Sequence, residues 1–382
     1  MRTNLCLEPW LLSFEQRKEV FNDAKRRGVK IALYFAKEPD ISTFRYRCFN
    51  TYQVTLSSQK WQAVYFYQME LDEVLKMINC VDLLVFARTR WNNSSKILVD
   101  AARKKHIPTV FDVDDLVFDK KYVRVVTNTI GDLNALDYWL PYFSDMNEMA
   151  KRTDGFLVTN DLLGKKIGAS FGRSYKVIRN SMNKEQIQAS EAYLCVDREY
   201  SKKQFTVGYF GGSPTHENDL AVALPEVIEF LRRHKNAKLR VVGYMNFEKN
   251  CHEFLREGRI EFVPFVDFRK LQGLLAEVDV NIAPLVLNDF TNCKSELKFF
   301  EAAAVETTTI ASPTYTFKKA IKDGENGFLA YPGEWYDKLE YLYEHPDENR
   351  KIAREARKYA LKHYYGTEFL KEVEEAYDYF VK

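Results

Sequence analysis

Twelve short apolar runs, each rich in β-branched and aromatic residues, recur along the chain with helix-length segments between them. The runs are continuous rather than alternating, which is typical of parallel strands covered by helices on both faces. Strand–helix alternation predicts a doubly wound α/β sheet, and six runs in each half predict two such sheets. The runs span residues 30–36, 63–68, 83–89, 109–114, 155–160 and 175–180 in the first half, and 205–210, 239–243, 260–264, 280–284, 308–312 and 327–331 in the second.

The chain has 382 residues, enough for two domains of ordinary size. The polar stretch 183–203 contains no strand signal, so we expect a first domain over residues 1–190 and a second over 200–365. Apolar residues after 335 recur at helical spacing, and we expect the last helix, about 366–382, to pack back on the first domain. Two such Rossmann-like domains are expected to face a cleft at the carboxyl ends of their strands, where ligands of these folds bind.

Composition excludes several classes of protein. The 56 basic and 54 acidic residues give a net charge of only +2, which disfavours nucleic-acid binding. The six cysteines form no CxxC pair and are expected to be free thiols in a reducing compartment. No signal-peptide pattern and no run of roughly 18 apolar residues is found. We therefore expect a cytoplasmic protein, and basic residues such as Arg26 and Lys104 leave peripheral association with the inner face of a membrane open.

The first candidate motif is VGYFGGSPTHENDL, residues 207–220, where a strand runs into paired glycines. Glycines let the backbone approach a ligand closely, and the following Ser-Pro is typical of a helix start whose free N–H groups bind phosphate. The alternative is an ordinary strand–turn–helix without a ligand. The spacing is not GxGxxG, so the nicotinamide fingerprint is absent. The candidate residues of this turn are Gly211, Gly212, Ser213, Thr215 and His216.

The second motif is PLVLNDFTNCKSELKFFEAAA, residues 284–304, directly after a predicted strand. Lys294 and Lys298 lie four residues apart, and Ser295 is placed where a helix can begin. On a helix, Glu301 projects from nearly the same face as the lysines. Two ammonium groups and a helix N-terminus can hold a diphosphate, with the carboxylate accepting hydrogen bonds from a ribose. The alternative is a solvated charged face.

With these motifs the second half resembles the nucleotide-sugar domain of the GT-B glycosyltransferases, in the large retaining group called family 4. The resemblance covers residues 205–365 and includes the glycine turn, VDVNIAPL, EAAAVETTTIASP and IKDGENGFLAYPGEW. The first half is similar to the acceptor-binding domain of these enzymes through RTDGFLVTN and YKVIRNSMN.

The resemblance implies where a donor binds. It implies a base near Phe265 and Val266, a ribose on Glu301, and a diphosphate between the glycine turn and the loop that carries Lys294, Ser295 and Leu297. It also implies retention of the donor's anomeric configuration and neither a metal nor another cofactor, the nucleotide sugar being a co-substrate. Lys298 and Glu301 are the expected catalytic groups of this half.

The sequence departs from the family pattern at two places. The family's Glu-x7-Glu has Cys293 at its first position and Glu301 at its second. The family's Arg and Lys near the glycine turn are also replaced, with Tyr209 close to the Arg position. Lys294 and Lys298 are plausible substitutes for these cations.

A third motif, FDVDDLVFD, places four aspartates at the end of the fourth predicted strand: Asp112, Asp114, Asp115 and Asp119. One interpretation is an Asp-x-Asp site for magnesium or manganese, which GT-B enzymes generally lack. Asp114 aligns where many relatives carry an active-site histidine. We therefore expect Asp114 and Asp115 to line the cleft and orient acceptor or donor hydroxyls, with an N-cap as the alternative.

Arginines follow two other strands of the first half. Arg45 and Arg47 occur in STFRYRCFN, and Arg88 occurs in RTRW, residues 88–91. We expect them at the acceptor side of the cleft, where an arginine can hold a phosphate or an anionic acceptor carrier. The alternative is that they are ordinary exposed arginines.

These observations predict a metal-independent glycosyltransferase that moves a sugar from a nucleoside diphosphate sugar to a glycan, lipid-linked or protein acceptor. Two alternatives stay open: a nucleotide-sugar 2-epimerase of the same architecture, and a catalytically silent partner of a sister glycosyltransferase.

Overall fold

The computed structural model describes residues 8–37, 39, 42–131, 136–194, 204–211, 217–243 and 251–381. The chain divides into two compact units. The first contains the described residues of Met1–Val123, Asp137–Glu185 and Tyr365–Lys382, and the second those of Arg124–Leu136 and Gln186–Tyr364. Each unit is therefore built from separate stretches of sequence. The described residues of 124–136 and residues 186–190 group with the second unit, whereas the sequence led us to expect all of 1–190 in the first domain.

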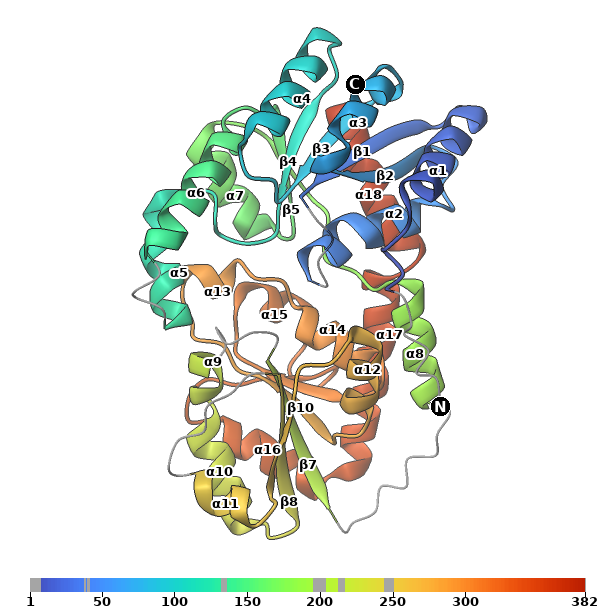
Figure 1. Cartoon of the computed structure of the whole chain (residues 1–382). Helices are drawn as coiled ribbons and strands as arrows, with labels where there is room; N and C mark the ends of the chain where they lie inside the picture. Colours follow the sequence, from blue (N-terminus) through green and yellow to red (C-terminus); the bar gives the residue numbers. More distant parts are fainter. Residues whose placement is uncertain are drawn as a thin grey trace. The chain divides into compact units, whose positions relative to one another are not determined.

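The first unit has a six-stranded parallel sheet in the order β2-β1-β3-β4-β5-β6 (Figure 1). Most positions of its first five strands are buried, as expected for a sheet covered on both faces. The strands are β1 (Lys30–Ala36), β2 (Trp61–Tyr67), β3 (Leu83–Ala87), β4 (Thr109–Val113), β5 (Gly155–Val158) and β6 (Tyr175–Val177).

The second unit repeats the design with the order β12-β11-β10-β7-β8-β9, again all parallel. The prediction of two doubly wound sheets is thus confirmed, and all twelve predicted runs contain a strand. The strands are β7 (Phe205–Gly211), β8 (Ala237–Gly243), β9 (Ile260–Val263), β10 (Val280–Ala283), β11 (Thr308–Ala311) and β12 (Phe328–Leu329).

Helices connect the strands in both units. Those of the first unit are α1 (Phe14–Arg27), α2 (Asn50–Thr55), α3 (Leu71–Met77), α4 (Asn93–Lys104), α6 (Leu136–Ala150), α7 (Asp161–Phe171) and α18 (Thr367–Phe380). Helices α5 (Val123–Ile130) and α8 (Lys184–Leu194) lie where the chain passes from the first unit to the second. Those of the second unit are α9 (Glu217–Ala221), α10 (Leu224–Arg233), α11 (His252–Arg256), α12 (Phe268–Ala276), α13 (Asp289–Asn292), α14 (Leu297–Ala303), α15 (Tyr315–Ala320), α16 (Trp335–Glu344) and α17 (Pro346–Tyr364).

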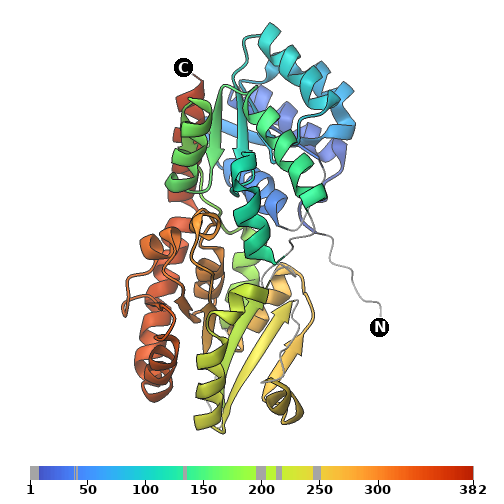
Figure 2. The same cartoon turned by 90° about the vertical axis from the view of Figure 1, so that its left-hand side faces the viewer.

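The C-terminal helix α18 completes the core of the first unit, where it packs beside α2 and β6 (Figures 1 and 2). Tyr377 on this helix is fully buried, and its ring lies 5.1 Å from that of Trp61 on β2. Its hydroxyl is 2.9 Å from the hydroxyl of Tyr34 on β1. These contacts bring residues more than 300 positions apart in the sequence into one core.

One glycine is required by the close approach of two strands in the second unit. Gly243 ends β8 with φ of +115°, and a Cβ atom at this position would lie 1.7 Å from the carbonyl oxygen of Gly211 at the end of β7. No L-residue with a side chain can occupy this position without moving one of the strands. The ends of β7 and β8 are therefore held close together, backbone against backbone.

Candidate functional site

The second unit has a topological switch point between β7 and β10. From β7 the chain adds β8 and β9 on one side, and then returns to place β10 on the other side of β7. Crevices beyond the carboxyl ends of strands at such a reversal are where open α/β sheets bind ligands. The predicted phosphate turn follows β7 and the predicted lysine motif follows β10, so the two motifs meet at this point.

Lys298 connects the two motifs directly. It lies in the first turn of α14, and its Nζ donates a hydrogen bond of 2.6 Å to the carbonyl oxygen of Phe210 in β7. The Tyr209 ring lies 4.7 Å from the same nitrogen. Burial lowers the pKa of Lys298 to about 8; the Lys294 charge also lowers it, while Asp219 and Glu301 oppose the shift. The ammonium is thus held in a desolvated place beside a second cation.

Glu301 lies one turn further along α14 and is 5% exposed. Its Oε1 accepts a hydrogen bond of 3.1 Å from Nε2 of Gln186, a buried residue of α8. The carboxylate that the sequence assigns to a ribose is therefore oriented by an amide that sequence reasoning missed. Gln186 carries no motif, and only the packing of α8 brings it to Glu301.

The loop before α14 differs in detail from the prediction. Helix α14 begins at Leu297 rather than at Ser295, and Glu296 is its N-cap residue. The buried Glu296 carboxylate accepts a 2.6 Å hydrogen bond from the hydroxyl of Tyr364 and so fixes the helix start. Lys294 stays near the site, and its Nζ lies 4.5 Å from the centre of the Phe290 ring.

The remaining predicted donor residues fall into three groups. Gly211 is the buried last residue of β7. Phe265, 42% exposed, and the half-buried Val266 follow the end of β9, where Val266 packs on the apolar cluster around Phe210. The other residues of the glycine turn lie outside the described residues: Gly212, Ser213, Thr215 and His216.

Cys293, which the resemblance aligns with the family's first Glu, is the C-cap residue of α13 and a fully buried thiol that forms no disulfide. A buried thiol cannot replace a carboxylate in binding a polar ligand group. The two cations Lys294 and Lys298, rather than Cys293, are thus the groups of this loop that can bind a ligand anion.

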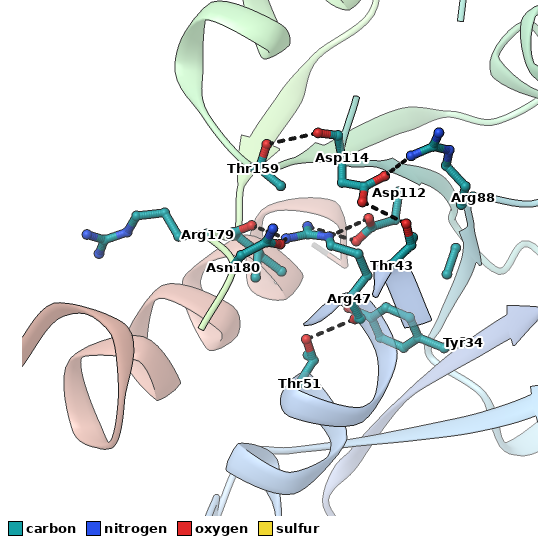
Figure 3. A network of polar contacts seen from close by, with 12 residues as sticks. Tyr34, Thr43, Arg47, Thr51, Arg88, Asp112, Asp114, Thr159, Arg179 and Asn180 are labelled. Atoms are coloured by element: carbon teal, nitrogen blue, oxygen red, sulfur yellow. Dashed lines mark hydrogen bonds and ion pairs between the residues drawn. The ribbon is translucent and has the colours of Figure 1, made fainter. Parts of the chain in front are cut away.

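Arg47 of the first unit is an internal residue, which corrects the expectation that it faces a ligand. Its guanidinium forms a bidentate ion pair with Asp112 of β4 at 2.8 and 3.0 Å, and both side chains are 1% exposed (Figure 3). Its Nη1 also donates to the carbonyl of Ile178 and to Asn180. Burial raises the pKa of Asp112, and the Arg47 charge opposes that shift. This buried pair joins the π-helical turn that contains Arg47 to β4.

Arg45 begins the same π-helical turn and is also buried, at 4% exposure. Its Nη2 lies 2.5 Å from the hydroxyl of Tyr46, and its guanidinium lies over the ring of that residue at 4.3 Å. The alternative of an ordinary exposed arginine is therefore wrong for Arg45, and its place at the acceptor side of the cleft stays a prediction.

Asp114 and Asp115 are held by Arg88. Nη1 of Arg88 donates to Asp114 and lies 3.3 Å from Asp115, and Thr43 donates to the other oxygen of Asp114 at 2.9 Å (Figure 3). Their side chains are 12% and 26% exposed. Asp119, by contrast, accepts from the backbone N–H of Lys121 and caps the short helix there, whereas the sequence offered an N-cap only as the alternative for Asp114 and Asp115.

Arg88 itself has a strained backbone, with φ of +47° just after β3. Such a conformation is uncommon for a residue with a Cβ and persists only where the surroundings fix it. The Nε atom donates a 2.8 Å hydrogen bond to the hydroxyl of Tyr142 on α6. Burial raises the pKa of Tyr142, with Arg88 opposing the shift.

A cavity of about 560 Å³ opens beside Arg88. The structure places Arg88 at the wall of this cavity, and its expected role at the acceptor side of the cleft stays a prediction. The two tyrosines from α6 at this wall, Tyr138 and Tyr142, have no sequence signal, because they lie some fifty residues away from Arg88 in the chain.

Within the described residues, no group of three or more His, Cys, Asp or Glu side chains is arranged to hold a metal ion. Over the same part of the chain, no helix is both long and apolar enough to cross a membrane.

Two doubly wound parallel sheets, each with polar groups gathered at its switch point, define the GT-B glycosyltransferase fold. Residues 204–345 match the family model described as Glycosyl transferases group 1, so the second unit contains a domain of that family. The family resemblance predicted from the sequence is thereby confirmed. No curated protein sequence matches the chain.

Solved structures agree on the fold. HepE of Anabaena, crystallised with UDP, superposes with a TM-score of 0.61 at 14% identity, over 92% of this chain and 100% of that one. Sucrose-phosphate synthase of Thermosynechococcus elongatus gives 0.61 at 12% identity, over 92% and 98% of the two chains. A glycosyltransferase of Rickettsia africae gives 0.61 at 12% identity, over 92% and 99%. At these identities the likeness establishes a shared fold.

Proposed function

We propose that the protein is a glycosyltransferase that uses a nucleoside diphosphate sugar as donor. The observation that carries the proposal is Lys298, a desolvated ammonium at the switch point of a group 1 glycosyltransferase domain. Asp219 and Glu301 offset only part of the cost of keeping this cation out of water beside a second cation, and a further anion would lower that cost. A diphosphate between the glycine turn and Lys298 supplies that anion.

The other groups of this unit suit the rest of a nucleotide. Glu301, oriented by Gln186, can accept hydrogen bonds from ribose hydroxyls. The exposed ring of Phe265 suits a base. UDP is our first choice of nucleotide, because HepE of the same fold was crystallised with UDP and with UDP-glucose.

Transfer needs little chemistry from side chains beyond positioning and charge. The bond from the sugar's anomeric carbon to the diphosphate breaks, and an acceptor hydroxyl forms the new bond on the same face. Its proton passes to the departing diphosphate oxygen. Lys294 and Lys298 stabilise the developing negative charge, which is the role that a metal plays in other transferases. We therefore propose retention of configuration without a metal, with the acceptor bound by the first unit.

Donor binding is tested by titrating UDP into the wild type and into Lys298→Met and Glu301→Gln. Loss of a charge-assisted hydrogen bond, about 1.5–3 kcal/mol, predicts a Kd about 10- to 150-fold higher for each variant. Lys358→Met replaces an exposed lysine of α17 that is 72% accessible, and serves as the matched control. If both site variants bind UDP like the control, the donor site has been misplaced.

The reaction is tested with a panel of nucleotide sugars, with and without EDTA. Without an acceptor, we expect the protein to hydrolyse its donor slowly, and the rates with and without EDTA should agree within a few-fold. Epimerisation of the sugar would identify an epimerase instead. Loss of turnover in EDTA that only manganese restores would show that the reaction needs a metal. With an acceptor present, NMR of the first-formed product reports the anomeric configuration, and an inverted linkage would refute retention.

A further inference from the structure

A segment from the first half of the sequence belongs to the second unit. Helix α5 lies between β4 and β5 in the chain, yet the described residues of 124–136 group with the second unit. There α5 contacts α9, which follows β7, and the loop after β10 (Figure 1). Strands β7 and β10 are the two strands of the switch point. The chain thus leaves the first unit to reach the elements beside the candidate donor site, and then returns to the first unit in α6.

Thr129 of α5 makes both contacts and is 6% exposed. Its carbonyl oxygen accepts a hydrogen bond of 3.2 Å from Nδ2 of Asn218 on α9. Its Oγ1 accepts one of 2.8 Å from Nδ2 of Asn288 in the loop after β10. The same hydroxyl donates its proton to the carbonyl oxygen of Val125, one turn earlier in α5. The hydroxyl therefore has a fixed direction, with its proton toward α5 and its lone pair toward the loop.

The amide of Asn288 is fixed in the same way. Asn288 is the N-cap residue of α13, and its Oδ1 accepts from the backbone N–H groups of Phe290 at 2.9 Å and Thr291 at 3.0 Å. This cap commits Oδ1 to α13 and leaves the Nδ2 donors for α5. The Phe290 ring, in turn, lies 4.5 Å from Nζ of Lys294. Contacts therefore run from Thr129 through the cap of α13 to one of the two predicted donor lysines.

Asp219 closes the arrangement on its third side. It follows Asn218 on α9, is 2% exposed, and accepts a hydrogen bond of 3.1 Å from the backbone N–H of Val286 in the loop after β10. Its charge also acts on Lys298, the other predicted donor lysine, where it opposes the lowering of the pKa. Helix α5, helix α9 and the loop after β10 are thus joined pairwise by three hydrogen bonds.

Binding groups that are held in place before a ligand arrives bind it more tightly, because less conformational entropy is lost on binding. We propose that α5 is a clamp on the donor site, and that Thr129 is the positioning residue that holds α9 and the loop after β10 in the arrangement that binds the diphosphate. The effect on donor affinity rests on the proposed function, whereas the effect on the two elements does not. Donor affinity then depends on a segment that lies outside residues 204–345, the part that matches the group 1 family.

The first test is hydrogen exchange of the intact protein without ligand, followed by mass spectrometry. Thr129→Val keeps the shape of the side chain and removes the hydroxyl. We expect the amides of the loop after β10, among them Val286, Phe290 and Thr291, to exchange about 3- to 10-fold faster in this variant. Peptides from β8 and β11 should exchange as in the wild type. Thr129→Ser keeps the hydroxyl and should restore wild-type exchange in the loop.

The matched control is Thr127→Val, the same substitution two residues earlier in α5. Thr127 is 1% exposed, and its hydroxyl donates to the carbonyl oxygen of Arg124 within the same helix. Both valine variants lose a bond inside α5, and Thr129→Val alone also loses the bond to Asn288. Asn218→Ala removes an exposed side chain that makes the other contact with Thr129, and should speed exchange in α9.

The second test is calorimetric titration of UDP into the same proteins. Thr129→Val should raise the Kd about 3- to 10-fold, with Thr129→Ser and Thr127→Val within about twofold of the wild type. Wild-type exchange in Thr129→Val, equal effects of the two valine variants, failure of Thr129→Ser to restore exchange, or faster exchange with unchanged UDP affinity would each overturn the proposal. A wild type that binds no UDP would refute the proposed function and the donor part of this proposal, while the exchange rates would still decide whether α5 holds the two elements.

Discussion

Lys298 makes donor binding depend on pH in a way that can be calculated. With a pKa of about 8, the free site is about 90% protonated at pH 7 and about 10% protonated at pH 9. If the ammonium form alone holds the diphosphate, UDP affinity falls about tenfold between these pH values. An ordinary lysine would stay almost fully charged over the same range. UDP binding takes up a proton at pH 9 for the same reason.

The perturbation that isolates this effect is Lys298→Arg, because arginine keeps its charge at every pH used. The assay is isothermal titration of UDP from pH 7 to 9.5, a range above the last phosphate ionisation. We expect the affinity of the wild type to fall and that of the variant, whatever its absolute value, to stay level. A flat profile for the wild type, or the same decline in both proteins, would refute the assignment of the charge to Lys298.

The same residue affects stability with a definite sign. Its pKa is lower in the folded protein than in the unfolded chain, so the unfolded chain holds more protons between about pH 8 and 10.5. The free energy of unfolding that Lys298 contributes therefore rises with pH across this window. It follows that Lys298→Met should not lower the Tm of the ligand-free protein at pH 7, even though it weakens UDP binding. A large fall in Tm would show that the ammonium is structural.

Two further predictions concern the framework. Arg47→Ala leaves Asp112 buried and unpaired and should destabilise the protein by about 3–5 kcal/mol in urea unfolding. The double variant Arg47→Met, Asp112→Leu should recover much of that loss. If Arg47→Ala is as stable as the wild type, the pair is dispensable. Gly243→Ala forces a Cβ against the carbonyl of Gly211 and should cost at least about 2 kcal/mol in the same assay; a wild-type midpoint would contradict the strand spacing described above.

The sequence predicted both sheets because buried parallel strands leave continuous apolar runs that need no tertiary information. It also predicted that Lys298 and Glu301 lie on one helix, which α14 confirms, and their spacing fixes how they are related; their role in donor binding stays a prediction. The role of Arg47 was not predictable in this way. A polar residue after a strand can turn outward to ligand or inward to the core, and the inward choice depends on Asp112, 65 positions away.

The cavity of the first unit shows the same limit. Arg88 belongs to the RTRW motif, but the cavity wall also contains Tyr138 and Tyr142 of α6, which no sequence pattern distinguishes from other helix residues. Likewise, no spacing rule connects Gln186 with Glu301. Pairings of this kind arise from the packing of distant segments, and local patterns carry no record of them.

The return of α18 to the first unit has a consequence for how the protein is made. Trp61 and Tyr34 bury their rings against Tyr377, and the indole N–H of Trp61 donates to Asp378 at 2.8 Å. Arg179 is likewise held by Glu372 at 2.6 Å. During synthesis these partners leave the ribosome after the whole second unit, so part of the first unit's core stays uncovered until the second unit has been translated. A chain that stops before α18 would therefore lack part of the first unit's core.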